Sequence, residues 1–177
     1  MYFLQLCEMV SCLDRLEQQY KDKPVVIVPG GGAFADQVRL AQGRWQFDDT
    51  TAHRMAILAM QQMALLIHGL KSHWPMAEST SRITEQLNTH NVSIWSPDIK
   101  ELQLHHIAES WDITSDSLAA WLANKLCAER LTLVKSTPID QNLNLQELSQ
   151  VGVIDKSFYQ FVTDSAFKID IVHQTDL

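Results

Sequence analysis

Val25-Val-Ile-Val-Pro-Gly-Gly-Gly-Ala-Phe-Ala-Asp-Gln-Val-Arg39 is the stretch of the chain that decides the fold. Its four opening β-branched residues predict a short strand that is buried on both faces, as in a parallel sheet. Pro29 ends this strand because it has no N–H to donate to a neighbour. Three glycines follow, and a helical pattern begins at Ala33. The stretch therefore predicts a strand, a glycine turn and a helix in direct succession.

Gly30, Gly31 and Gly32 leave unpaired N–H groups at the start of the predicted helix, with no Cβ to obstruct them. An anion fits against such groups, so the turn indicates a site for a carboxylate or a phosphate. The alternative is a tight turn that binds nothing. The glycine spacing matches neither G-x-G-x-x-G nor G-x-x-x-x-G-K-[ST], so it supports neither a Rossmann fingerprint nor a P-loop.

Composition is typical of one soluble globular domain over residues 1–177, with 46% hydrophobic and 20% charged residues. The net charge is −7 and the chain has no block of Lys or Arg, which argues against a nucleic-acid partner. A small anionic substrate remains compatible with this charge, because local backbone dipoles outweigh it at close range.

The three cysteines are an odd number and follow no metal-ligand spacing, so we expect reduced thiols in a cytoplasmic protein. The N-terminus carries Gln5 and Glu8 and does not resemble a signal peptide. No apolar run approaches membrane-spanning length, so we expect no membrane partner. His105 and His106 are adjacent and point apart on a regular element, so we predict no metal site.

Helical and strand patterns alternate along the chain. We therefore predict an α/β fold, a three-layer α/β/α sandwich on a mainly parallel sheet. Residues 99–107 fit either a helix or an extended segment. Helices are expected over residues 3–20, 33–42, 50–68, 81–87, 114–126, 145–150 and 155–166, and strands over 25–28, 92–95, 131–134 and 169–172.

The sequence makes a separate prediction for each of three helix starts. The helix over 50–68 is apolar almost all round, so it is either covered by other elements or part of a subunit interface. His53 and Arg54 lie in its first turn, and we predict an exposed pair there. Asp155 is predicted to cap the last helix. Thr114 to Ser117 are strong helix-start residues, and capping alone would explain them.

Two segments together resemble the amino-acid kinase superfamily of acetylglutamate, aspartate and uridylate kinases. They are the stretch from Val25 to Arg39 and the stretch Trp111-Asp-Ile-Thr-Ser-Asp-Ser-Leu-Ala-Ala-Trp-Leu-Ala123, which leads into Leu131-Thr-Leu-Val-Lys-Ser136. Thr51-Ala-His-Arg-Met-Ala-Ile57 adds to the likeness. The chain most resembles the small archaeal and methylotroph branch that includes the kinase of methanofuran synthesis.

The resemblance implies an open, mostly parallel sheet between helices and an ATP-dependent small-molecule kinase. In this family ATP and Mg²⁺ deliver a phosphoryl group to a carboxylate, phosphate or alcohol. The likeness to the methanofuran branch further implies a role in one-carbon cofactor synthesis. Matched to this sequence, the resemblance assigns substrate binding to Gly30, Gly31, Gly32, Arg39, Thr114 and Ser115, nucleotide binding to Lys135 and Ser136, and catalysis to Asp116 and, on a loose alignment, Lys156.

The sequence departs from the family at three places. The family opens with a strand and a Lys-x-Gly-Gly-Ser loop, whereas this chain starts in the helix that follows them, so the first strand is expected to be missing. Thr137-Pro-Ile-Asp140 stands where the family has an Asp-Val-Asp-Gly loop. The chain also ends soon after its final strand. The alternative function is thus a catalytically silent relative that binds a ligand or another subunit.

A missing first strand would leave a sheet edge open, and an open edge invites pairing between chains. We therefore predict a homodimer or a larger homo-oligomer.

Overall fold

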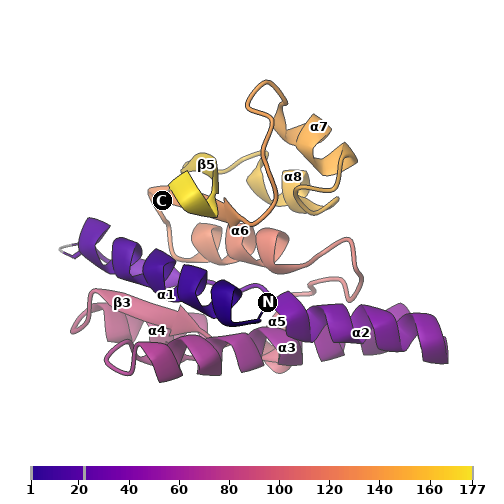
Figure 1. Ribbon diagram of the computed structural model, residues 1–177, viewed down its shortest axis with the longest axis horizontal. Helices are drawn as coiled ribbons and strands as arrows, with labels where there is room; N and C mark the ends of the chain where they lie inside the picture. Colours follow the sequence, from indigo (N-terminus) through magenta and orange to yellow (C-terminus); the bar gives the residue numbers. More distant parts are fainter. Residues whose placement is uncertain (1, 22, 177) are drawn as a thin grey trace.

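The computed structural model describes residues 2–21 and 23–176, with side chains from residue 11 onward. At least one helix separates each strand from the next in the described residues, which agrees with the predicted helix and strand pattern (Figure 1). The helices are α1 (Tyr2–Gln19), α2 (Gly32–Trp45), α3 (Asp49–Leu70), α4 (Thr80–Leu87), α5 (Ile99–Leu104), α6 (Ser115–Lys125), α7 (Leu145–Gln150) and α8 (Phe158–Val162). The strands are β1 (Val25–Ile27), β2 (Met76–Ala77), β3 (Val92–Trp95), β4 (Arg130–Lys135) and β5 (Lys168–His173), and a short 3₁₀ helix, η1 (Gln174–Asp176), follows.

Every strand pairing in the described part of the chain is parallel, which confirms the predicted α/β class. The strands form two sheets, one in the order β1-β3-β2 and one of β4 with β5. Strand β1 pairs with β3 alone, so it is an edge strand and its residues are only half-buried. The prediction that this strand is buried on both faces is therefore wrong. The two residues of β2 lack any alternating pattern and were not predicted.

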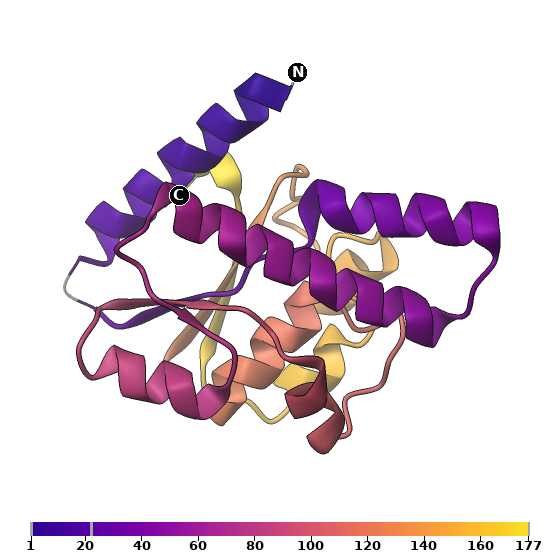
Figure 2. The ribbon, with the colours of Figure 1, turned by 90° about the horizontal axis from the view of Figure 1, so that it is seen from below.

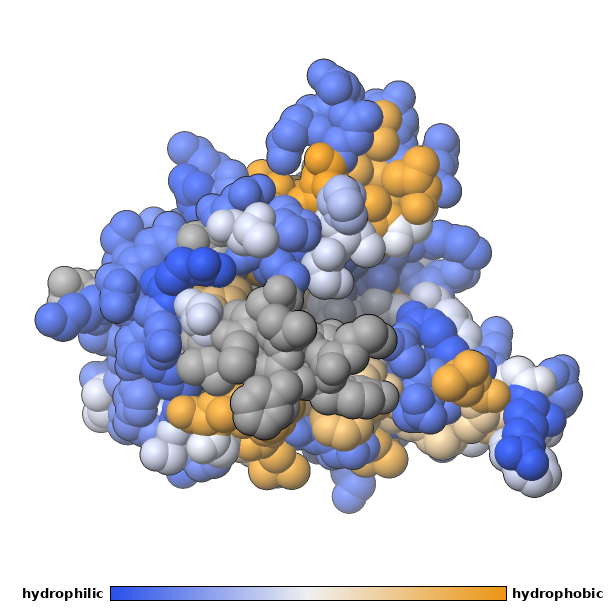
Figure 3. All heavy atoms as spheres, viewed as in Figure 1, coloured by the Kyte–Doolittle hydropathy of each residue, from blue (hydrophilic) through white to orange (hydrophobic). Residues whose placement is uncertain are grey.

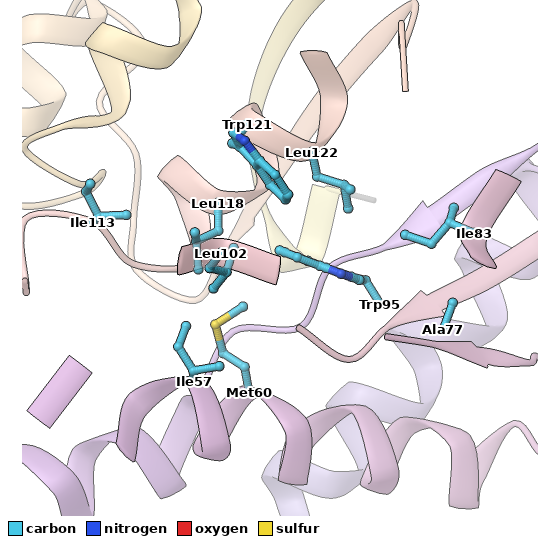
Figure 4. Close-up of a cluster of buried hydrophobic side chains, with 10 residues drawn as sticks. All are labelled: Ile57, Met60, Ala77, Ile83, Trp95, Leu102, Ile113, Leu118, Trp121 and Leu122. Carbon is cyan, nitrogen blue, oxygen red and sulfur yellow. The ribbon is translucent and has the colours of Figure 1, made fainter. Parts of the chain in front are cut away.

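Helix α6 is the central element of the molecule, because its two faces belong to two different hydrophobic cores. Leu118, Trp121 and Leu122 pack with α3, α4 and β3, and Trp121 lies 5.9 Å from Trp95 between ring centroids. Figure 4 shows these side chains in one cluster with Ile57 and Met60 of α3, with Leu102 and Trp95 between the two helices. Ala119, Ala120 and Ala123 pack instead with β4, α7 and α8.

Helices α2 and α3 lie side by side as an antiparallel pair (Figure 2). Asp48 caps α3, since its carboxylate accepts from the Thr51 N–H at 2.7 Å. The helix thus begins at Asp49, one residue before the predicted start at residue 50. One face of α3 is buried, while Leu58 and Leu65 remain 48% and 59% exposed. The helix is therefore covered on one side only.

The C-terminal helices differ from the prediction. Helix α8 is shorter than predicted, because it ends at Val162 instead of near residue 166. The Asp155 side chain does not cap it, because that carboxylate binds the start of α6. The face seen in Figure 3 is mostly hydrophilic, with apolar groups over α7 and α8 and along the lower rim, where α3 and α4 lie. Among the described residues, no helix has the length and apolar character needed to cross a membrane.

Leu118→Ala is expected to lower the free energy of unfolding by about 2–5 kcal/mol, because it opens a cavity in the core beneath α6. Leu118 is fully buried, whereas Leu104 is 78% exposed and provides the control. Leu104→Ala should change stability by less than about 0.5 kcal/mol. Urea unfolding followed by circular dichroism measures both, and equal losses would contradict this description of the core.

Candidate functional site

The glycine turn brings α2 to the rim of a cleft with its first N–H groups free. Gly31 is the N-cap residue, and its carbonyl accepts from the Ala35 N–H at 3.1 Å. Within the described residues, the N–H groups of positions 30–34 have no hydrogen-bond partner. Gly32 has a φ of +49°, and a Cβ there would lie 2.6 Å from the Met63 methyl. The turn therefore requires glycine and presents unpaired donors.

A second helix start, that of α6, lies against the same cleft. A Cβ built on Gly30 would lie 3.4 Å from the Ser115 Oγ, so the two helix starts approach closely. Thr114 is the N-cap residue of α6 and has an extended backbone. Together they border a cavity of about 300 Å³. It is lined by Gly30–Gly32, Arg39, Thr114, Ser115 and Ser136, among others.

Arg39 contributes the positive charge at this cavity. Its guanidinium lies 4.3 Å from the Trp111 ring centroid, which is a cation–π arrangement. The Trp111 indole N–H donates to the Gln42 side chain at 2.7 Å. This hydrogen bond fixes the orientation of the ring against which the Arg39 guanidinium packs. Arg39 also lies 3.6 Å from Asp36, an exposed carboxylate one turn away that lines the same cavity. The cavity thus combines two helix starts with one oriented cation.

Asp116 and Lys135 form an ion pair directly behind the cavity. The Lys135 Nζ donates to the Asp116 Oδ2 at 2.5 Å, and both side chains are largely buried. Burial is the main cause that raises the pKa of Asp116, and the nearby charge of Asp155 raises it further, while Lys135 opposes both. Neither residue lines the cavity itself. Ser115 lines the cavity and directly precedes Asp116, so the ion pair lies next to the cavity wall.

Lys156 is not brought to the cavity. Its Nζ lies 3.3 Å from an Asp112 carboxylate oxygen, and its side chain is 80% exposed. Ser136 lines the cavity, and its carbonyl accepts from the His173 Nε2 at 3.2 Å. Of the predicted site residues, the structure therefore groups all but Lys156 at the cavity or immediately behind it.

His53 is a site residue that the sequence did not predict as such, because an exposed pair was expected. It is only 4% exposed and lines the cavity. The Ser110 carbonyl can only accept, so the His53 Nδ1 carries the proton of their 3.0 Å hydrogen bond. Arg54, in contrast, is half-exposed and pairs with Glu109 at 2.6 Å. A histidine in the first turn of a strongly apolar helix was the available signal.

These features define an α/β protein in which two helix starts and an arginine meet at one cleft that is lined by unpaired N–H groups. The model of the amino acid kinase family matches residues 5–139 of the chain. The chain therefore belongs to the amino acid kinase family.

The chain is also similar to two individual proteins. The chain is 29% identical over 106 residues to the [5-(aminomethyl)furan-3-yl]methyl phosphate kinase of Methanocaldococcus jannaschii, a match of 59% of this chain and 48% of that protein. The matched region thus spans about half the length of that curated relative. The uridylate kinase structure from Archaeoglobus fulgidus superposes with a TM-score of 0.64 at 17% identity, covering 94% of this chain and 82% of the other. This second likeness establishes the fold.

Protonation of His53 should make stability depend on pH. Burial lowers its folded-state pKa below the ordinary value of 6.5, so its contribution is complete above pH 6.5. That contribution is lost as the pH falls from 6.5 through the lowered pKa. His53→Gln should therefore flatten the dependence of the urea midpoint on pH between about 7 and 5. His106→Gln, at an exposed position, should leave the wild-type slope intact, and equal slopes in all three proteins would contradict the assignment.

Proposed function

We propose that the chain transfers a phosphoryl group from ATP to a small-molecule acceptor bound at the cleft. One observation carries this proposal, namely the convergence of the free N–H groups of α2 with the start of α6. Helix starts favour phosphate and carboxylate groups through these donors and through the positive end of the helix dipole. Membership in the amino acid kinase family supports the choice of ATP as donor.

We assign each residue at the cavity a role according to its position. The Gly30–Gly32 turn and Ser115 would hold phosphoryl oxygens through backbone and hydroxyl donors. Arg39 would neutralise charge on the acceptor, and Trp111 keeps its guanidinium aimed at the cleft. Asp116 would keep Lys135 in place near the phosphoryl oxygens. Catalysis would rest on positioning and charge stabilisation, in which one donor contributes roughly 3 kcal/mol, and it needs no covalent intermediate.

The donor set fits a phosphate chain better than a protein-held metal. No group of three or more His, Cys, Asp or Glu side chains in the described residues could hold an ion. Mg²⁺ would therefore arrive with the phosphates of the nucleotide and neutralise part of their charge. Gly30–Gly32, Ser115 and Lys135 are the residues we expect to face this complex.

We further propose that the acceptor is a small ring compound of one-carbon cofactor synthesis. The relative from Methanocaldococcus jannaschii is named for a phosphate ester of an aminomethylfuran. Ile57, Met60 and Ile113 give the cavity an apolar wall beside its anion-binding rim. A volume of about 300 Å³ accommodates an acceptor of that size beside the phosphoryl group.

A catalytically silent relative is the second candidate function. Thr137-Pro-Ile-Asp140 stands where the family has an Asp-Val-Asp-Gly loop, and the Nζ of Lys156 pairs with Asp112 outside the cavity. Such a protein would bind the same ligands through the same helix starts without turnover.

Calorimetry with Mg-ATP and a coupled assay for ADP release distinguish the two candidates. The first predicts binding and turnover, with Asp116→Asn lowering turnover by at least about a hundredfold because Lys135 loses its charged partner. Asp164→Asn, an exposed change, is the control. Binding without turnover would favour the silent relative. Absence of nucleotide binding in the wild type would contradict the kinase and the nucleotide-binding form of the silent relative, and would leave a relative that interacts with another subunit.

We also propose that the chain forms a homo-oligomer. The open edge of β1 and the exposed Leu58 and Leu65 of α3 support this expectation. Sedimentation velocity should show a dimer or larger species. Leu58→Glu with Leu65→Glu should shift it towards the monomer if α3 forms the contact. A wild-type monomer at high protein concentration would refute the proposal.

A further inference from the structure

Asp155 lies in the segment between α7 and α8, yet its side chain binds the start of α6. One carboxylate oxygen accepts from the backbone N–H groups of Thr114 and Ser117, at 2.8 and 2.9 Å. The other accepts from the Thr114 hydroxyl at 2.5 Å. A residue about forty positions further along the chain thus supplies all three contacts. No residue within α6 or at its N-cap makes an equivalent side-chain bond to this turn.

This arrangement replaces the usual local cap of a helix. The N-cap residue normally accepts a hydrogen bond from an N–H of the first turn. Thr114 is the N-cap of α6 but makes no such bond, and its hydroxyl instead donates to Asp155. A negative charge at this position also interacts favourably with the helix dipole. The carboxylate therefore provides both hydrogen bonds and charge where a threonine hydroxyl would provide one bond.

The backbone around Asp155 is anchored at two places, the turn that precedes α6 and helix α7. The Ser157 N–H donates to the Asp112 carbonyl at 3.0 Å, and the Ser149 hydroxyl donates to the Asp155 carbonyl at 3.2 Å. Lys156 pairs with Asp112 across 3.3 Å. These hydrogen bonds and this ion pair therefore hold residues 155–157 against α7 and the turn that precedes α6. They restrict movement of Asp155 away from that turn.

The Asp155 carboxylate is also close enough to the Asp116 carboxylate for their negative charges to interact. Its charge acts with burial to raise the pKa of Asp116, while its backbone N–H and the Lys135 ammonium favour the charged form. Lys135 of β4 and Asp155 are the two charged groups that act on Asp116. The hydrogen bonds of Asp155 thus fix the Thr114–Ser117 turn, and its charge acts on the pKa of Asp116.

We propose that Asp155 is the positioning residue of the cleft, which fixes the Thr114–Ser117 turn and balances the charge that Lys135 places beside Asp116. Through this contact the segment that joins α7 and α8 determines where Ser115 and Asp116 stand. Its consequence for turnover rests on the proposed function, whereas its consequence for the fold and for Asp116 does not.

Two substitutions separate the two roles. In Asp155→Asn the amide oxygen can accept from both backbone N–H groups, and the amide nitrogen can donate to the Thr114 hydroxyl. This variant removes the charge and keeps the geometry. Asp155→Ala removes both. Asp112→Asn is the matched control, because its side chain pairs with Lys156 at the same turn but makes no contact with Asp116.

Carbon-13 NMR of the carboxyl groups and amide hydrogen exchange measure the outcome without any substrate. Asp155→Asn should lower the titration midpoint of Asp116 and leave the Ser117 amide protected. Asp155→Ala should speed exchange at Ser117 by about fivefold to tenfold, as expected for a lost cap. Asp112→Asn should change neither quantity.

The proposal is overturned if Asp155→Asn leaves the midpoint of Asp116 unchanged or raises it. It is equally overturned if exchange at Ser117 is unaffected in Asp155→Ala, or if Asp112→Asn has the same effects. If the wild type binds no nucleotide, the proposed function fails, but these measurements still decide the role of Asp155.

Discussion

The structure depends on one constraint, which is that α6 is buried on both sides. All residues from Asp116 to Ala123 are buried, with Leu118 and Trp121 in one core and Ala119 and Ala120 in the other. A helix held in this way cannot translate without opening two cores at once, and each core resists a cavity at a cost of several kcal/mol. Its first turn is therefore a fixed point, against which the glycine turn and Arg39 are arranged.

Fixed donors explain how a chain with a net charge of −7 can offer an anion site. The free N–H groups at positions 30–34 and the start of α6 are dipoles that need no reorganisation when a phosphate arrives. Their field acts over a few ångströms, within which the diffuse negative charge of the surface has little effect. Arg39 adds a full charge whose direction is set by Trp111.

Local patterns predicted much of this fold. The strand and glycine turn from Val25 to Gly32, the long helices and the strands over 92–95, 131–134 and 169–172 are each determined by neighbouring residues, and the structure contains them. The glycines were identified for the same reason, since a helix start is a local feature, whereas Ser115 was assigned through the family resemblance.

Features set by distant contacts were not predictable from local pattern. Asp155 precedes a short helix and was expected to cap it, but its three partners belong to a turn about forty residues earlier. His53 was expected at the surface, yet the Ser110 carbonyl holds it in the cavity wall. The half-burial of β1 follows from its edge position, which depends on strand order. In each case the deciding partner is remote in sequence.

The central claim is that the starts of α2 and α6 form one anion-binding cleft. Titration of nitrogen-15-labelled protein with Mg-ATP, followed by amide NMR, tests it most directly. The account predicts that the signals of Gly30, Gly31, Gly32 and Ser115 move together and fit a single dissociation constant. Signals of the glycine turn that move while Ser115 stays still, or two separate dissociation constants, would contradict it.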